Sequence, residues 1–124
     1  MADYTAPYEP GLQRESLGYD VRNPLYNTQG TYTQFSQDLR DAMEELSSLL
    51  LSKHLDYGPK NISDSPGGPL NGLRVRMHDK LARLNNLVDS GADPQHESLE
   101  DTFKDMANYA VIGLLVLRDK WDKK

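Results

Sequence analysis

The sequence contains no cysteine, which excludes disulfide bonds and thiolate chemistry. No apolar run approaches the ~18 residues that a membrane-spanning helix needs. Residues 1–30 lack the apolar segment of a signal peptide, so we expect a cytoplasmic protein without membrane contact. Basic residues are fewer than acidic ones, 14 against 19, and the net charge of −5 disfavours binding to duplex nucleic acid.

Phenylalanine and tryptophan are scarce, whereas leucine is frequent from Leu39 onward. This composition suits packed helices, and a length of 124 residues suits a single domain. We therefore predict an all-α protein. Its three main helices, within residues 32–124, form a bundle that oligomerisation completes, and an irregular N-terminal arm, residues 1–31, precedes them.

The N-terminal arm is rich in glycine and proline and shows neither a strand period nor a helix period. A disordered tail is one interpretation, because such a segment buries too little surface to offset the entropy cost of ordering. Disordered tails are usually poor in aromatic residues, however. Tyrosines in this arm would anchor it across the bundle or onto a second subunit; they are Tyr4, Tyr8, Tyr19 and Tyr26.

Apolar residues at spacings of three and four predict helices over residues 33–56 and 70–88. Gly58 is placed to end the first helix, and Pro59 blocks its continuation. The composition of residues 61–69, NISDSPGGP, predicts a loop between the two helices.

Ser98 is the expected N-cap of a third helix that runs to about Lys120, with Asp101 three residues later as in a capping box. The centre of this helix, MANYAVIGLLVL, is apolar almost all round, as in helices that are buried on most sides. Three helices of this size do not cover it easily. We therefore expect a homo-oligomer, a dimer or a tetramer, that completes a bundle of four or more helices.

Charge is sorted by helix, because the basic segment 70–88 lies between two acidic segments, 38–56 and 97–118. Attraction between neighbouring helix surfaces explains this pattern without a ligand, at ~0–1 kcal/mol for each surface pair. The alternative is a phosphate and metal site. In such a site carboxylates hold Mg²⁺, while lysine and arginine bind the phosphate oxygens.

The spacing of Glu97, Asp101, Asp105 and Asn108 puts them on one face of the third helix. Glu97 and Asp101 lie near the helix N-terminus, where the dipole and the cap favour acidic residues. Asp105 lies farther in, directly before the apolar run, where a charge is costly unless a bound cation or a basic partner compensates it. Asp105 is therefore the strongest candidate for a functional carboxylate.

Asp79 lies at helical spacing between Arg76 and Arg83, which fits either a salt-bridged surface acid or a metal-ligating carboxylate. In the second interpretation Lys80 and Arg83 bind phosphate beside it. Glu45 fits a second carboxylate cluster or an exposed face equally well. The histidines show no metal spacing, and neither a Ser-His-Asp order nor a phosphate-binding glycine loop is present.

The stretch KHLDYGPKN at the end of the first helix carries more charged and polar side chains than a helix stop requires. It brings together Lys53, Asp56, Tyr57, Lys60 and Asn61. If the helices pack antiparallel, this end of the first helix lies near the start of the second. Whether Asp56 meets a metal, a base or Lys60 is open.

Three stretches in this order, KHLDYGPKN, LRVRMHDKLARLNNL and ESLEDTFKDMANYAVIGLL, resemble the phage and bacterial family called nucleotide modification associated domain 1, over residues 35–118. The helical pattern of that family is similar to that of the MazG-like nucleoside triphosphate pyrophosphohydrolases. The resemblance implies Mg²⁺ on helix-borne carboxylates, with Asp101 and Asp105 on the second metal-binding helix. It also implies cleavage between the α and β phosphates, and the host cytoplasm as the location of a phage-encoded protein.

The sequence departs from the pattern of those enzymes in two places. EELSS at 44–48 holds only the first half of the usual E-E-x-x-E, and TFKD at 102–105 has threonine where E-x-x-D has glutamate. Nucleotide binding without hydrolysis therefore stays open as an alternative.

The leading hypothesis from the sequence is an oligomeric, Mg²⁺-dependent pyrophosphohydrolase that acts on a (deoxy)nucleoside triphosphate or a modified relative. The alternatives are a non-catalytic module that sequesters a nucleotide or assists DNA-base modification, and a purely structural helical oligomer. Under the leading hypothesis Asp79 and Asp105 are catalytic. The expected metal ligands are Asp79, Asp101, Asp105, Glu45 and Glu97. The expected substrate-binding residues are Lys53, Asp56, Tyr57, Lys60, Asn61, Lys80, Arg83 and Asn108.

Overall fold

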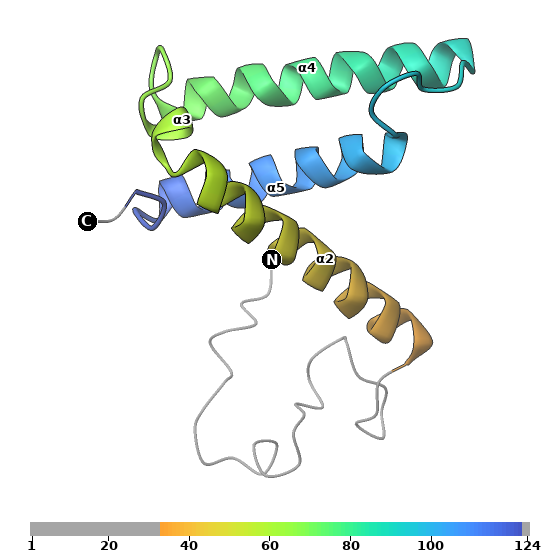
Figure 1. Cartoon of the computed structure of the whole chain (residues 1–124), viewed down its shortest axis with the longest axis horizontal. Coiled ribbons are helices and arrows are strands. Elements are labelled where there is room, and N and C mark those ends of the chain that lie inside the picture. Colours follow the sequence, from red (N-terminus) through yellow and green to blue (C-terminus); the bar gives the residue numbers. More distant parts are fainter. Residues whose placement is uncertain (1–32, 123–124) are drawn as a thin grey trace, which may run out of the picture. The chain divides into compact units, whose positions relative to one another are not determined.

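The computed structural model describes residues 33–122, so the predicted arm over residues 1–31 lies outside the described part of the chain. The described residues form helices and no strand, which confirms the prediction of an all-α protein (Figure 1). The described residues divide into two units, 33–44 and 45–122. None of the helices in residues 33–122 is long and apolar enough to cross a membrane.

Helix α2 spans Gln34–Tyr57 and begins where the sequence predicted. Thr33 caps it, because its Oγ1 accepts the backbone N–H of Ser36 (3.0 Å) and its carbonyl accepts that of Gln37 (3.0 Å). The helix ends at Gly58, whose φ of 65° is the left-handed conformation that glycine adopts without strain. The N–H of Gly58 donates to the carbonyl of His54 (2.8 Å), so the predicted stop is confirmed.

Two helices follow this stop, α3 at Lys60–Ser63 and α4 at Pro69–Ser90. The predicted loop over residues 61–69 thus holds most of a short helix, which its composition did not reveal. Pro69 occupies the first turn of α4, where its missing N–H costs nothing, and Gly91 ends α4 in the left-handed conformation.

Helix α5 spans Leu99–Leu117 and lies antiparallel beside α4 (Figure 1). The predicted cap is confirmed, because Oγ of Ser98 accepts the N–H of Asp101 (3.0 Å). The helix ends before the predicted Lys120. Its last residues close in a left-handed turn at Asp119, where φ is 54° and where N–H groups of the turn donate to the carbonyls of Leu115 and Val116.

This turn directs Trp121 back onto the junction between α2 and α3. The indole N–H donates to the carbonyl of Pro59 (3.1 Å), and the ring meets that of His54 edge-on, with centroids 4.8 Å apart. Next to it, Lys60 and Asp122 form an ion pair (2.9 Å). Trp121 and Asp122 therefore pack against the C-terminal end of α2, which carries the KHLDYGPKN stretch.

The core of the unit from residue 45 onward is small. Ile62, Leu73 and Ile112 are buried, and Leu50, Tyr109, Val116 and Trp121 pack against them. Several large apolar side chains of α5 stay exposed within one chain, namely Phe103, Leu114 and Leu117. The sequence predicted that α5 is buried on most sides, but within one chain it is only partly buried. The homo-oligomer stays a prediction.

Gly72, in the first turns of α4, is expected to resist substitution, whereas Gly113 in α5 is expected to tolerate it. A Cβ on Gly72 would overlap Oγ and Cβ of Ser65, but a Cβ on Gly113 would meet only Cδ1 of Leu73 at 3.9 Å, an ordinary contact. We expect Gly72→Ala to lower the free energy of unfolding by about 1–3 kcal/mol through overpacking. Gly113→Ala, the control, should raise it by roughly 1 kcal/mol through helix propensity.

Urea denaturation of both variants and the natural chain measures these differences. Equal effects of the two alanines, in either direction, would contradict the close approach of Ser65 to Gly72.

Candidate functional site

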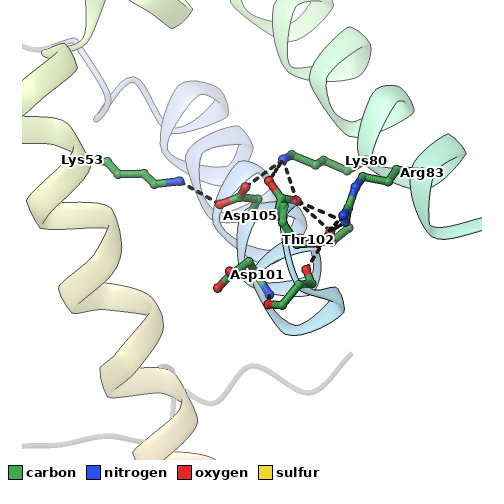
Figure 2. Close-up of polar contacts among 8 residues, drawn as sticks. Lys53, Lys80, Arg83, Asp101, Thr102 and Asp105 are labelled. Atoms are coloured by element: carbon green, nitrogen blue, oxygen red, sulfur yellow. Dashed lines mark hydrogen bonds and ion pairs between the residues drawn. The ribbon is translucent and has the colours of Figure 1, made fainter. Parts of the chain in front are cut away.

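Asp105 is held between two lysines from two other helices (Figure 2). Nζ of Lys53, on α2, lies 2.8 Å from its Oδ1, and Nζ of Lys80, on α4, lies 2.9 Å from its Oδ2. The charge that the sequence marked as costly before the apolar run is therefore compensated by basic partners, one of the two alternatives that the sequence offered. Three helices meet at this carboxylate.

A second layer of contacts fixes Lys80 in place. Its Nζ donates to both carboxylate oxygens of Glu97 (2.8 and 3.0 Å), and Glu97 in turn accepts the hydroxyl of Thr102 (2.7 Å). Thr102 is fully buried, and its Oγ1 accepts a hydrogen bond from Arg83 (2.6 Å). Arg83 also donates to the carbonyl of Glu97. The cluster is continuous, and each polar side chain in it forms an ion pair or a hydrogen bond with another member.

The lysines shift the protonation of both carboxylates. Burial raises the pKa of Asp105, but the hydrogen bonds from Lys53 and Lys80 outweigh it and hold the pKa below its usual range. The hydrogen bond from Lys80, followed by that from Thr102, lowers the pKa of Glu97. The hydrogen bond to Asp105 raises the pKa of Lys53. These shifts favour the charged forms of Asp105, Glu97 and Lys53.

A pocket of about 260 Å³ opens beside Asp105, next to the ends of α2 and α3. Its polar and charged lining residues are Lys53, His54, Asn61, Arg76, Asp105 and Asn108. Its aromatic and aliphatic lining residues are Tyr57, Tyr109, Trp121, Leu50, Ile62 and Ile112. Polar and apolar groups thus line the pocket in about equal number, and polar groups that converge on apolar walls are typical of a small-molecule site.

The structure brings together four of the residues that the sequence selected for substrate and also Asp105, which the sequence selected as a catalytic residue and metal ligand. Lys53, Tyr57 and Asn61, from the KHLDYGPKN stretch, face the same pocket as Asp105 and Asn108 from α5. Nδ2 of Asn108 donates to the carbonyl of Leu46 (3.1 Å), which fixes the amide. Three other residues do not line the pocket but contact α5 and the residue before its cap. Lys80 pairs with Asp105 and Glu97, and Arg83 donates to Thr102.

Other selected residues lie elsewhere. Asp79 is exposed on α4, and the two arginines that flank it in the sequence turn to other partners. The backbone N–H of Asp101 donates to the cap residue Ser98, and its side chain is exposed (Figure 2). Glu45 and Asp56 are exposed and do not line the pocket. Lys60 pairs with Asp122 rather than with Asp56.

Among the charged, polar and aromatic lining residues, sequence reasoning missed His54, Arg76, Tyr109 and Trp121. His54 belongs to the KHLDYGPKN stretch, but the histidines show no metal spacing that would single it out. Arg76 was considered only as a partner of Asp79, whereas its guanidinium donates to the carbonyl of Asn61 (2.9 Å) and to Ser65 (3.3 Å). No local signal places Trp121 in the pocket, because the turn at Asp119 decides where it goes.

Of the carboxylates expected to hold Mg²⁺, Asp105 and Glu97 lie together, but they share Lys80 rather than an open space for a cation. Among residues 33–122 no three His, Asp or Glu side chains form a group that could hold a metal ion. Asp105 is the one expected ligand that lines the pocket, and each of its oxygens accepts a lysine, so a cation would have to displace one of them. Within one chain this donor set does not fit resident Mg²⁺.

Comparison with known families matches residues 70–117 to the model of nucleotide modification associated domain 1. No curated protein and no solved structure matches the chain. The matched segment comprises nearly all of α4, the connection after it and α5, and so includes Lys80, Arg83, Glu97, Thr102 and Asp105 but not the α2 side of the pocket. Over residues 70–117 the chain is therefore similar to this family, which confirms that part of the predicted resemblance.

Proposed function

We propose that this protein binds a nucleotide or modified nucleotide in the pocket beside Asp105. The observation that carries the proposal is the convergence in one pocket of two cationic side chains, Lys53 and Arg76, with aromatic rings and amides. Cations recognise phosphate, aromatic rings stack on bases, and amides hydrogen-bond base edges or sugar hydroxyls. The similarity of residues 70–117 to a family described by nucleotide modification supports this choice of ligand.

Lys53 is well suited to meet a phosphate. Its side chain is 48% exposed, and Asp105 holds it at the pocket wall. An ammonium group has three donors, and among residues 33–122 that of Lys53 hydrogen-bonds only to Asp105. Lys53 can therefore donate to a phosphate without breaking its ion pair.

A second candidate function is Mg²⁺-dependent cleavage of a nucleoside triphosphate to the monophosphate and pyrophosphate. The observation that favours it is the position of Asp105, the candidate catalytic carboxylate, in the pocket wall. This function requires further oxygen ligands for the metal, from the substrate or from a second copy of the chain. Release of pyrophosphate from triphosphates with Mg²⁺, abolished in Asp105→Asn, would favour this candidate over binding alone.

The test of the binding function is a thermal-shift screen of ribo- and deoxynucleotides, followed by calorimetry on the hits. A ligand that binds the folded state raises the melting temperature. We expect Lys53→Met to weaken nucleotide binding about tenfold or more, as loss of one charge-assisted hydrogen bond implies. Lys104→Met is the matched control, because Lys104 pairs with Glu100 and does not line the pocket.

Unchanged affinity in Lys53→Met, or an equal loss in Lys104→Met, would contradict the assignment of this pocket. Absence of any nucleotide-dependent shift across the screen would contradict the function itself.

A further inference from the structure

The pocket changes character along α5, from charged to apolar. Asp105 stands at one end, Asn108 and Tyr109 in the middle, and Ile112 at the other end. At 1.5 Å per residue, Asp105 and Ile112 are about 10 Å apart along the helix axis. Trp121 and Ile62 join Ile112 in the lining. A ligand that fits these lining residues is short. It carries a charge at the Asp105 end and an aromatic or apolar group at the Ile112 end.

The charge of the site limits how much anion it can neutralise. The pocket and the cluster behind it contain four basic side chains and two acidic ones, a net charge of +2; these are Lys53, Arg76, Lys80, Arg83, Glu97 and Asp105. A single phosphate ester carries about −1.5 to −2 at neutral pH. Further phosphates would add charge that the site does not match.

The apolar end of the pocket holds a polar atom that lacks a partner. Nδ1 of His54 is buried and makes no hydrogen bond with any of residues 33–122. His54 lines the pocket and its ring is held edge-on against Trp121. A buried polar atom without a partner is costly. Because Nδ1 is closed to solvent in this conformation, the ring of His54 has to turn before a ligand atom can pair with it and remove that cost. A base edge offers both donors and acceptors for this nitrogen.

We infer that the ligand is a nucleoside monophosphate, bound without a metal ion, with its phosphate at Lys53 and its base against the paired rings of His54 and Trp121. This inference rests on the proposed nucleotide-binding function and narrows it to one ligand class. The phosphate is recognised at the charged end of the floor, and the base is read at the apolar end, where Nδ1 of His54 supplies the specific hydrogen bond.

Calorimetry in the presence of EDTA tests this inference with nucleosides and with their monophosphates and triphosphates. For the preferred base, the monophosphate should bind at least tenfold more tightly than either the nucleoside or the triphosphate. Two variants separate the ends of the pocket. Lys53→Met should lose the preference for the monophosphate, so that it binds monophosphate and nucleoside with nearly equal affinity. His54→Phe, which retains an aromatic ring against Trp121, should weaken both ligands alike and reduce the discrimination between bases.

A triphosphate that binds more tightly than the monophosphate, or binding that requires Mg²⁺, would overturn the inference and leave the proposed function standing. An unchanged ratio in Lys53→Met, or unchanged base preference in His54→Phe, would overturn the placement of phosphate and base. If no nucleoside or nucleotide binds with or without Mg²⁺, the proposed function itself fails.

Discussion

Replacing Leu73 by alanine is expected to lower the free energy of unfolding by about 2–5 kcal/mol, the usual cost of removing a buried leucine side chain. Leu73 is 3% exposed and joins α4 to Ile62 of α3 and Ile112 of α5. These three are the only large apolar residues of the described chain that are buried. A small domain has roughly 5–15 kcal/mol of stability in total, so this one cavity removes a large fraction of it.

The matched control is Leu81→Ala, on the same helix. Leu81 is 45% exposed, so its truncation removes little buried surface and should change the stability by less than ~1 kcal/mol. Urea denaturation followed by far-UV circular dichroism measures both variants. Because Leu73 does not line the pocket, a variant that remains folded should keep its ligand affinity. Equal stability losses for the two leucines would show that α4 and α5 do not share the core described here.

Local patterns predicted the helices well, because each of these signals acts within a few residues. Gly58 and Gly91 end helices through their own left-handed conformations, and Ser98 caps α5 through a neighbouring N–H. Such features need no knowledge of tertiary packing. The short helix α3 was missed because the glycines and prolines that follow it dominated the composition of its segment.

The candidate site was predicted in part. Lys53, Tyr57 and Asn61 were selected from a stretch with more polar residues than a helix stop needs, and they do line a pocket with Asp105. Asp105 stands out because its position makes an uncompensated charge expensive, and this argument predicts that basic groups compensate it. It did not identify them, since Lys53 is 52 residues away in the sequence.

The grouping of metal ligands shows where sequence reasoning ends. The spacing put Asp101 and Asp105 on one helix face, but a helix face is wide, and only Asp105 reaches the pocket. Asp79 shares α4 with Lys80, yet its side chain is exposed while that of Lys80 is turned to α5. Adjacent positions on a helix point about 100° apart, so the neighbour of a site residue is usually outside the site.

Asp105→Asn is expected to lower the free energy of unfolding by about 2–4 kcal/mol. Surface ion pairs contribute ~0–1 kcal/mol, and breaking a fully buried pair costs ~3–5 kcal/mol. The side chains of Asp105 and Lys80 are 13% and 19% exposed, which places this pair near the buried limit, while Lys53 at 48% contributes less. Asp101→Asn, one turn earlier and exposed, is the control and should change the stability by less than ~1 kcal/mol.

The pH dependence of stability distinguishes this electrostatic loss from a loss of packing. The pKa values of Asp105 and Glu97 are lower in the folded chain than their usual values, so the folded state binds fewer protons in acid than the unfolded state does. Their stabilisation is present above the ordinary carboxylate pKa of about 4 and is lost as the pH falls through the folded values. The natural chain should therefore lose stability steeply below about pH 4, measured by urea midpoints across a pH series. Asp105→Asn should lack the part of this loss that comes from protonation of Asp105. The free energies of unfolding of the natural chain and the variant should therefore converge as the pH falls. Parallel curves would show that the lysines do not stabilise the folded chain through the charge of Asp105.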